Sequence, residues 1–268
     1  MKEQELRFVG SVPGSYDRLM VPFFFRPYAE ELARRAQQSR PKRIIETAAG
    51  TGVVTEALNR AIPDAEIIAT DLNQPMLEVA ADRLRSDKIC FVTADAAELP
   101  FDSRGFDLVV CQFGAMFFPD KVRAHAEARR VLREDGRYLL AIWDRIERNP
   151  VSAATQQALI DFFPDDPPLF LCQGPFGYHD PAAIEADLRH AGFGTIQIDT
   201  VELRSRSPSA HDAAAALCYG TPMAIELEDR GHHTLDRVFA EVERALDRFV
   251  KADGIDEPMS AHIVTASN

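Results

Sequence analysis

A glycine-rich turn carries the clearest chemical signal in this sequence. An apolar run ends in Glu46 and continues as Thr47-Ala48-Ala49-Gly50-Thr51-Gly52 before a helix-length segment. Because Gly50 and Gly52 have no Cβ, a turn of this kind lets the backbone approach a ligand closely. The free N–H groups of a helix that begins near Gly52 can bind a carboxylate or a phosphate. Either anion would fit this turn.

A carboxylate follows the turn at the spacing of a nucleoside site. Asp71 ends the next apolar run, 19 residues after Gly52, where an acidic side chain can accept hydrogen bonds from both ribose hydroxyls. The dinucleotide pattern G-x-G-x-x-G would start at Gly50 and require a small residue at position 55, where the sequence has Thr55. These residues favour a nucleoside ligand, and they leave an NAD(P)-dependent oxidoreductase as the less favoured alternative.

The elements that must position these residues alternate between strand and helix. Short β-rich runs at 43–47, 66–71, 89–93, 106–111 and 137–143 alternate with helical patterns at 52–61, 75–85 and 120–132. This order predicts a parallel sheet with crossover helices. The nearly continuous apolar character of the runs predicts strands that are covered on both faces.

The flanking regions predict helical additions and two more strands. A helical segment at 16–38 should break or kink at Pro22 and Pro27. After the strand at 137–143 we expect the following elements: a helix at 151–163, a Pro-rich and Phe-rich insertion to about 179, a helix at 181–191, a strand at 195–203, an amphipathic helix at 235–249 that ends before a turn at Gly254, and a strand at 259–266.

Four segments of the region 43–143 have the order and spacing of a known set of motifs. They are the turn already described, Thr70-Asp71-Leu72-Asn73-Gln74-Pro75-Met76-Leu77, Thr93-Ala94-Asp95-Ala96-Ala97-Glu98-Leu99-Pro100-Phe101, and Phe106-Asp107-Leu108-Val109-Val110-Cys111. Together they resemble the class I S-adenosylmethionine-dependent methyltransferases, most closely the ubiquinone and menaquinone biosynthesis type (methyltransferase type 11/25). Two departures are Ala48, where a glycine is usual, and Glu134-Asp135, where Pro-Gly is usual.

The resemblance implies a Rossmann-like methyltransferase fold with S-adenosyl-L-methionine as the cofactor and S-adenosyl-L-homocysteine as the product. By this resemblance, Glu46 stands near the methionine amino group. The backbone of Ala48, Gly50 and Gly52 contacts the methionine and ribose portion, and Asp71 holds the ribose. Apart from the resemblance, Glu46 and Asp71 could each be a solvated charge at a strand end.

The resemblance also assigns the adenine side of the site. Leu72 and Met76 would pack on the adenine faces, Asp95 would accept from the adenine amino group, and the N–H of Ala96 would reach a ring nitrogen. Gln112 would line the methionine and methyl end. The alternatives are that Leu72 and Met76 belong to the core and that Asp95 is a helix N-cap.

The acceptor pocket is expected over the carboxyl ends of the strands, with an apolar wall from the N-terminal helices, residues 113–118 and the insertion. The candidate residues of this pocket are Phe25, Tyr28, Phe113, Phe117, Trp143, Phe176 and His179. The aromatic rings could equally pack only against the sheet. None of the seven histidines falls in a matched motif, so we assign no catalytic residue, and we predict no metal site.

Composition limits the partners. The chain has 30 Lys and Arg against 42 Asp and Glu, a net charge of −12. A field of that sign repels nucleic acid and anionic membranes. The four cysteines lie far apart, residues 1–7 lack the apolar core of a signal peptide, and no run approaches the roughly 20 apolar residues of a membrane span. We therefore expect a cytoplasmic enzyme with a small-molecule substrate.

The expected fold class is α/β: a doubly wound, mostly parallel, seven-stranded sheet with a helical cap and insertions. We expect residues 1–40 to form a helical cap over the active site, 41–145 the S-adenosylmethionine-binding core, and 146–268 a part that completes the sheet, with a substrate-side insertion at about 150–180. The acceptor atom (O, N or C) stays open, and so does a homodimer formed through the amphipathic helix. A third reading is a non-catalytic S-adenosylmethionine-binding protein.

Overall fold

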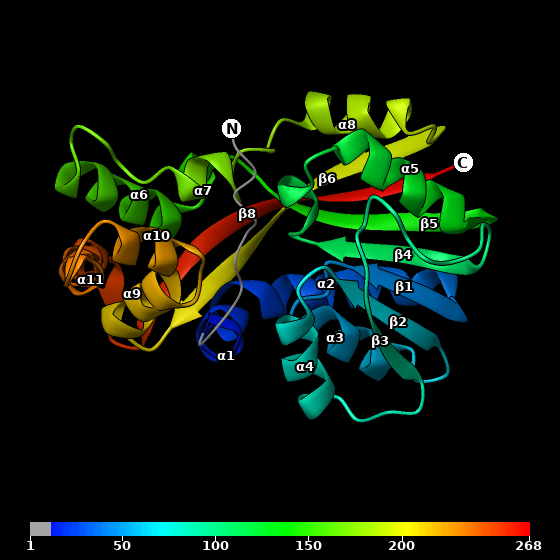
Figure 1. The fold of residues 1–268 in the computed structure, drawn as a ribbon, viewed down its shortest axis with the longest axis horizontal. Helices are drawn as coiled ribbons and strands as arrows, with labels where there is room; N and C mark the ends of the chain where they lie inside the picture. The colour runs from blue at the N-terminus through cyan, green and yellow to red at the C-terminus, as the bar shows by residue number, and fades with distance from the viewer. Residues whose placement is uncertain (1–11) are drawn as a thin grey trace.

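A single sheet organises the chain. The computed structural model describes residues 12–268 (Figure 1), so the expectation for residues 1–7 and the first part of the expected cap lie outside the described residues. Eight strands form the sheet in the order β3-β2-β1-β4-β5-β8-β6, with β7 paired to β8 off this path. The strands are β1 (Arg43–Thr47), β2 (Glu66–Asp71), β3 (Ile89–Thr93), β4 (Phe106–Gln112), β5 (Leu132–Trp143), β6 (Thr195–Ser207), β7 (Val250–Lys251) and β8 (Gly254–Ser267).

Strand direction confirms the predicted fold class. The pairs β1–β2, β1–β4, β2–β3 and β4–β5 are parallel, whereas β8 runs antiparallel between β5 and β6. The path therefore holds the seven strands expected, and the two-residue β7 is an addition. The strand order reverses between β1 and β4, and in open α/β sheets ligands bind at such a switch point, beyond the carboxyl ends of the strands.

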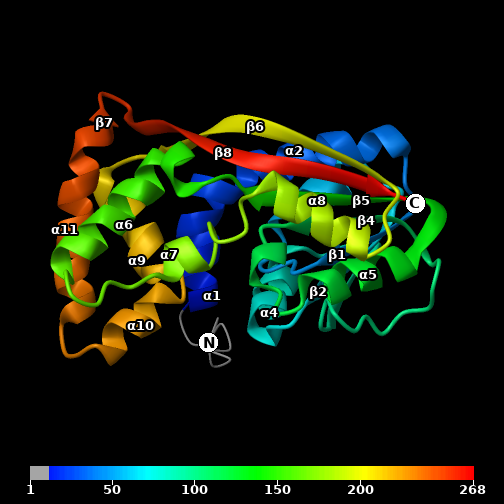
Figure 2. The ribbon, with the colours of Figure 1, turned by 90° about the horizontal axis from the view of Figure 1, so that it is seen from above.

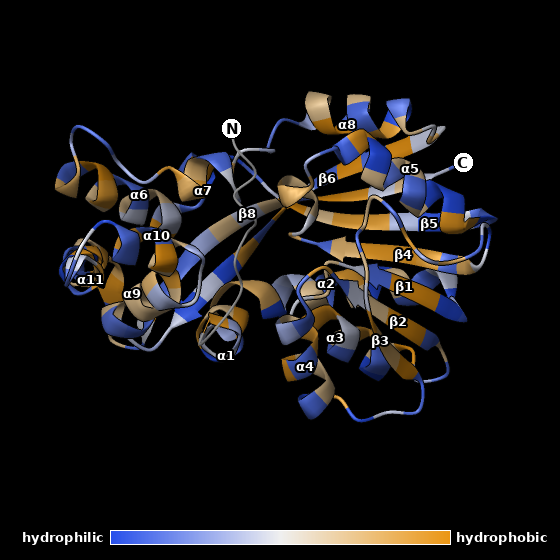
Figure 3. Ribbon diagram, viewed as in Figure 1, coloured by the Kyte–Doolittle hydropathy of each residue, from blue (hydrophilic) through white to orange (hydrophobic). Residues whose placement is uncertain are grey.

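Helices cover both faces of the parallel part. In Figures 1 and 2, α2 (Arg26–Ala36), α3 (Val53–Ala61) and α4 (Gln74–Arg83) lie on one face, and α5 (Lys121–Val131) and α8 (Pro181–His190) on the other. In Figure 3 most of β4 and the second half of β5 are coloured hydrophobic, whereas the first half of β5 carries charged residues. Ile44, Ile45 and Val109 are completely buried, as expected for strands covered on both faces.

Two prolines divide the N-terminal helical segment. After a short α1 (Val12–Ser15), the wide π-type helix η1 (Tyr16–Phe25) contains Pro22, and α2 begins with Pro27 in its first turn. Pro22 cannot donate a backbone hydrogen bond, whereas a proline in the first turn removes only a donor that the helix leaves unpaired. The expected helix at 16–38 is therefore two helices and a final turn, η2 (Gln37–Ser39).

A helical lobe stands beside the sheet. It comprises α6 (Pro150–Phe162), α7 (Phe170–Gln173), α9 (Ala210–Tyr219), α10 (Met223–Asp229) and α11 (Thr234–Leu246), which gather at one end of the molecule in both Figure 1 and Figure 2. The strands β6 and β8 reach into it, since their pairing continues to Ser207 and Ile255. Short turns complete the chain: η3 (Ala115–Phe117), η4 (Ile146–Arg148) and η5 (Asp247–Phe249).

Several expectations for this half were incomplete. The strands at 195–203 and 259–266 are longer than expected, the insertion contains the short helix α7, and the helix at 235–249 ends at Leu246. Neither α9 nor α10 was expected. The Ala-rich α9 is buried on most sides, so it lacks the apolar stripe that identifies a surface helix. Within residues 12–268, the helices are too short or too polar to cross a membrane.

A buried histidine lies between α5 and the sheet. His125 is completely buried, and its Nδ1 is 3.3 Å from the hydroxyl of Tyr138. Its Nε2 has no partner among the described residues. Burial lowers the pKa of His125 to about 4, while nearby Asp187 acts in the opposite direction. The imidazole is therefore neutral in the folded chain.

We predict that His125 makes the fold sensitive to acid. Its pKa is about 4 in the folded chain and about 6.5 when unfolded. The unfolded state therefore binds more protons between these values, and stability falls as pH drops through this window while staying level above it. The loss between pH 7.5 and pH 5 should be about 2 kcal/mol. Urea unfolding across this range should show a flatter dependence for His125→Leu, with exposed His232→Gln as the control. Equal slopes for wild type and His125→Leu would contradict the assignment.

Candidate functional site

The turn after β1 has an unusual backbone. Ala48, Gly50 and Gly52 adopt positive φ angles of 53°, 55° and 79°. The turn is held by hydrogen bonds from the Ala49 N–H to the Thr70 carbonyl and from the Gly52 N–H to the Ala49 carbonyl, both 2.9 Å. Glycine adopts such angles readily, and alanine does so at an energetic cost. The chain thus passes from strand to helix α3 in a tight bend at the switch point of the sheet.

Ala48 has a matching partner after β4. A Cβ placed on Gly114 would lie 2.4 Å from the Cβ of Ala48 and 3.1 Å from the Sγ of Cys111. Real Cβ atoms do not approach so closely, so the methyl group of Ala48 occupies the space that a side chain at Gly114 would need. The departure from the usual glycine at position 48 is therefore accommodated by a glycine 66 residues later.

Asp71 joins the ends of β1 and β2. Its Oδ2 accepts a hydrogen bond from the Gly50 N–H and its Oδ1 one from the Asn73 N–H, both 2.8 Å. Burial raises the pKa of Asp71, and these backbone hydrogen bonds oppose the rise. The Asn73 side-chain amide also donates to Oδ1, at 3.2 Å. A carboxylate offers about four lone-pair positions, so with these three bonds in place Asp71 retains one for a ribose hydroxyl, and a second hydroxyl would take the place of the Asn73 amide.

Glu46 is a second buried carboxyl at this edge. Its side chain is 1% exposed, and its Oε2 accepts a 2.6 Å hydrogen bond from the hydroxyl of Thr55. Burial raises its pKa to about 8; the Thr55 hydrogen bond works against that rise, and the charge of Asp71 adds to it. Thr55, which argues against a dinucleotide site, thus positions Glu46. A cationic group placed beside Glu46 would favour its ionised form.

Buried polar atoms without partners gather around the turn. Seven buried side-chain atoms of residues 12–268 lack a hydrogen-bond partner, and five of these belong to Asp17, Thr47, Thr51, Arg83 and Gln112. Thr47 and Gln112 end the adjacent strands β1 and β4, and Arg83 donates a 2.6 Å hydrogen bond to the Thr51 carbonyl. Buried polar groups are nearly always paired. Their concentration here indicates a site built to receive a polar ligand.

Tyr16, in the N-terminal helical segment, lies at this edge and was not among the site residues expected from the sequence. The ring of Tyr16 lies 3.9 Å from a Cβ placed on Gly50 and stacks on Phe25 at 5.1 Å. Burial and the nearby carboxyls Asp71, Asp17 and Glu46 raise the pKa of its hydroxyl. The neighbourhood of the turn is therefore acidic, which favours a ligand that carries positive charge.

The residues expected around an adenine ring differ in exposure. Leu72 is 66% exposed directly after Asp71, which is unusual for a large apolar side chain, whereas Met76 is 3% exposed and its methyl lies 3.5 Å from a Cβ placed on Gly50. Asp95 is exposed, and its Oδ1 accepts a 2.8 Å hydrogen bond from the Ala97 N–H. Ala96 is half-buried. A flat ligand lying on Leu72 would cover the exposed apolar surface.

Most of the rings expected in the acceptor pocket form one packed cluster. Phe113 and Trp143 stack in parallel with centroids 3.8 Å apart, and Tyr28 meets both edge-on. Phe25 and Phe176 pack on the same Trp143 at 6.4 and 5.9 Å. All five rings are at most 8% exposed. They form a packed apolar wall, and this mutual burial is also what the alternative reading of these rings predicts.

Three other side chains near this wall have distinct environments. Phe117 is half-buried and stacks on Phe170. His179 is exposed, and its Nδ1 lies 2.8 Å from the Phe176 carbonyl. Gln112 donates a 3.2 Å hydrogen bond to the Phe25 carbonyl, which leaves its Oε1 buried beside the cluster. Gln112 therefore links the turn to the aromatic wall.

Comparison with protein families confirms the resemblance for the core. Residues 45–140 match the methyltransferase domain family, which covers the turn, Asp71 and strands β2 to β4. The chain is 32% identical over 142 residues to a demethylmenaquinone methyltransferase of Thermotoga maritima and 36% identical over 129 residues to the ubiquinone/menaquinone biosynthesis C-methyltransferase UbiE of Idiomarina loihiensis. These matches cover 52% and 46% of this chain, and 61% and 49% of the relatives.

Solved structures share the fold over nearly the whole chain. The YcgJ protein of Bacillus subtilis superposes with a TM-score of 0.59 at 18% identity, covering 90% of this chain and 97% of its own. Phosphoethanolamine N-methyltransferase 2 of Haemonchus contortus, in complex with S-adenosyl-L-methionine, gives 0.60 at 14% identity, covering 95% and 56%. At these identities the likeness concerns the fold.

We predict that Ala48 and Gly114 are energetically coupled. Gly114→Ala should lower the free energy of unfolding by about 2 kcal/mol because the added methyl overlaps that of Ala48. Ala48→Gly should be neutral or stabilise by about 1 kcal/mol because it relieves a left-handed alanine. The double variant should recover most of the loss, a coupling that urea unfolding measures directly.

The matched control for this cycle is Gly14→Ala, since a Cβ there meets no atom within 4 Å. Additive effects of the two substitutions would show that the methyl groups do not compete for one space.

Proposed function

We propose that this chain, which contains a methyltransferase domain at residues 45–140, transfers the methyl group of S-adenosylmethionine to a small-molecule acceptor and releases S-adenosylhomocysteine. One arrangement carries the proposal. The bend at Gly50, the carboxylate of Asp71 and five side chains that each bury one polar atom without a hydrogen-bond partner lie at the switch point of the sheet. The donors, acceptors and acidic character present there fit a nucleoside that bears an amino acid and a positive charge.

The residues of the turn would hold the two ends of the cofactor. Glu46 would accept from the methionine ammonium group, and Ala48, Gly50 and Gly52 would offer backbone to the methionine and ribose portion. Asp71 would accept from the ribose hydroxyls while its bond to the Gly50 N–H keeps the bend in place. Glu46 enters this arrangement by losing its proton, because the positive charge of the ammonium group favours the ionised carboxylate.

Leu72, which is exposed, and Met76, whose methyl group lies next to Gly50, would pack on the adenine faces. Asp95 would accept from the adenine amino group, and the Ala96 N–H would reach a ring nitrogen. Gln112 would face the methionine and methyl end. When bound, the cofactor supplies an electrophilic methyl group on a sulfonium. The protein contributes alignment, since in-line transfer requires the acceptor atom and the methyl carbon to be held at close range. The rigid stack of Phe113 and Trp143 provides an apolar surface for this alignment.

We propose the class of acceptor from the residues of the aromatic wall and not from the substrates for which the relatives are named. The Thermotoga and Idiomarina enzymes are named for quinone biosynthesis, but each match covers about half of this chain. The aromatic cluster and the acidic net charge favour a small, partly aromatic or aliphatic metabolite as the O-, N- or C-acceptor. A mass-spectrometric screen of phenols, amines, reduced quinones, peptides and RNA would identify it. Transfer to RNA or peptides alone would contradict the proposal.

The organisation of the chain is part of the proposal. Residues 1–40 would cap the active site, 41–145 would bind the cofactor, and 146–268 would complete the sheet and supply the acceptor side through the insertion at 150–180. We further propose that the enzyme is cytoplasmic and binds neither nucleic acid nor membrane, on the strength of its charge. A homodimer through α11 is the open oligomeric alternative.

We predict that Asp71→Ala abolishes cofactor binding. The substitution removes the ribose acceptor and the carboxylate that holds the Gly50 N–H, so the affinity for S-adenosylhomocysteine should fall about 100-fold or more. Isothermal titration calorimetry of the full chain measures this, with exposed Asp64→Ala as the control. Wild-type binding of NADH without binding of either S-adenosyl compound would instead support an oxidoreductase.

We predict that cofactor binding releases a proton from Glu46. Its pKa in the free chain is about 8, so the group is mostly protonated at pH 7, and the bound ammonium requires it ionised. Affinity should therefore rise up to about tenfold per pH unit between pH 6 and pH 8 and level off above. Titration at pH 7 in buffers of different ionisation enthalpy should report the release of about one proton. Glu46→Gln should bind more weakly and without that release; an unchanged proton count in Glu46→Gln would assign the release to another group.

A further inference from the structure

Five chain segments connect the sheet to the helical lobe. Figures 1 and 2 show β6 and β8 running from one to the other, while the chain also crosses from β5 to α6 and from α7 to α8. The fifth connection is the step from η1, which packs against α9, to α2, which packs on the sheet. The position of the lobe relative to the cofactor site depends on these five crossings.

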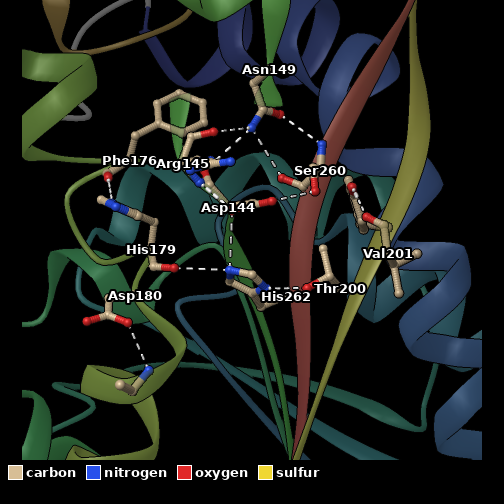
Figure 4. Close-up of polar contacts among 12 residues, drawn as sticks. Asp144, Arg145, Asn149, Phe176, His179, Asp180, Thr200, Val201, Ser260 and His262 are labelled. Atoms are coloured by element: carbon tan, nitrogen blue, oxygen red, sulfur yellow. Dashed lines mark hydrogen bonds and ion pairs between the residues drawn. The ribbon is translucent and has the colours of Figure 1, made fainter. Parts of the chain in front are cut away.

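A buried polar cluster fastens the crossing from β5 to α6. The pairing of β5 with β8 ends at Trp143 and Ala261. Beyond that pair, the side chain of Asn149 makes two hydrogen bonds to the backbone of β8. Its Oδ1 accepts a 3.0 Å hydrogen bond from the Ser260 N–H, and its Nδ2 donates to the Ser260 carbonyl at 3.3 Å. The Ser260 hydroxyl also donates to Asp144 Oδ2 at 2.8 Å (Figure 4).

His262 extends this cluster to two more crossings. Its Nδ1 is 3.0 Å from the hydroxyl of Thr200 on β6, and its Nε2 is 3.0 Å from the carbonyl of His179 in the α7–α8 connection. Because a carbonyl can only accept, Nε2 must carry a proton, and in the neutral imidazole Nδ1 then accepts from Thr200. The same Nε2 lies 3.5 Å from Asp144 Oδ1. Figure 4 shows the imidazole between these groups, and it is 3% exposed.

Tyr28, at the start of α2, connects the step from η1 to α2 with the same part of β6 and β8. Its hydroxyl lies 2.9 Å from the carbonyl oxygens of both Val201 and Met259, each next in sequence to a residue of the polar cluster. Tyr28 also packs edge-on against Trp143, which precedes Asp144. Hydrogen bonds therefore join all five connections to the same short stretch of β6 and β8, beside the aromatic wall.

We propose that Asp144, Asn149, Thr200, Ser260 and His262, here called the junction cluster, fix the lobe on the cofactor core, and that His262 is the positioning residue that sets the acceptor wall against the cofactor. The part that concerns the acceptor rests on the proposed function. Alignment tolerates little misplacement in a displacement reaction. A loosened junction should therefore slow methyl transfer without weakening cofactor binding, because no member of the cluster belongs to the cofactor turn.

Trp143 provides the readout, since it is the chain's single tryptophan and lies directly before Asp144. It is 5% exposed, so acrylamide should quench its fluorescence weakly in the wild type. In His262→Leu, the quenching constant should rise about fivefold as the junction opens. In His262→Gln it should stay near the wild-type value, because the amide can still donate to the His179 carbonyl. His232→Gln, an exposed histidine in the lobe, is the control.

Cofactor binding separates a positioning role from a general loss of stability. The affinity of His262→Leu for S-adenosylhomocysteine should stay within about twofold of wild type. With an acceptor from the screen, kcat should fall about tenfold or more. Unchanged quenching in His262→Leu, or a loss of affinity that parallels the loss of thermal stability, would overturn the proposal. If the leucine variant does not fold, Thr200→Val and Asn149→Ala, which each remove a subset of the contacts, give the same comparison.

The two proposals fail in different ways. If the wild-type chain binds no S-adenosyl compound, the proposed function is wrong, yet the quenching of Trp143 in the three histidine variants still tests the junction. If the cofactor binds and the quenching of Trp143 does not change on loss of His262, the function stands and the junction proposal is wrong.

Discussion

The hydrogen bond from the Gly50 N–H to the carboxylate of Asp71 is the contact on which the site depends. The bend after β1 requires three positive φ angles in five residues, one of them at an alanine, and such angles persist only where neighbouring groups enforce them. Asp71 supplies that constraint from the next strand. Losing it would leave a buried carboxyl and a backbone N–H without their mutual partner. One interaction therefore sets both the geometry of the bend and the position of the carboxylate that we propose binds the ribose.

Local signals explain what the sequence could predict. The strands at 43–47, 66–71 and 89–93 agree with the structure residue for residue, because each is a short run rich in β-branched and apolar residues that ends in a polar one, at Thr47, Asp71 and Thr93. The same signals define the turn and Asp71, which lie close together in the chain. Contacts between distant segments gave no such signal. The overlap of Ala48 with Gly114 and the ring of Tyr16 above Gly50 depend on how helices and strands pack.

The lobe was harder to predict than the core for a physical reason. A strand in a parallel sheet shows a continuous apolar run and a surface helix shows a stripe, but α9 is enclosed by α11, η1 and β6 and has neither pattern. Strands β6 and β8 continue past the expected ends because they pair with each other, even where their exposed faces are polar. Tertiary burial decides these elements. The family match covers residues 45–140 and so does not extend to the lobe.

The junction cluster and the turn after β1 differ in how completely their buried polar atoms are hydrogen-bonded. In the junction cluster, both oxygens of Asp144, both polar atoms of Asn149 and both nitrogens of His262 have partners. Around the turn, Thr47, Thr51 and Gln112 each bury an atom that has none within the described chain. A fully paired buried network holds one geometry, because any rearrangement would expose an unpaired group to a low-dielectric interior. An incompletely paired one gains the missing bonds when a ligand enters. Hydrogen bonding therefore predicts a rigid region at the joint between core and lobe, and a region that responds to ligand binding at the bend.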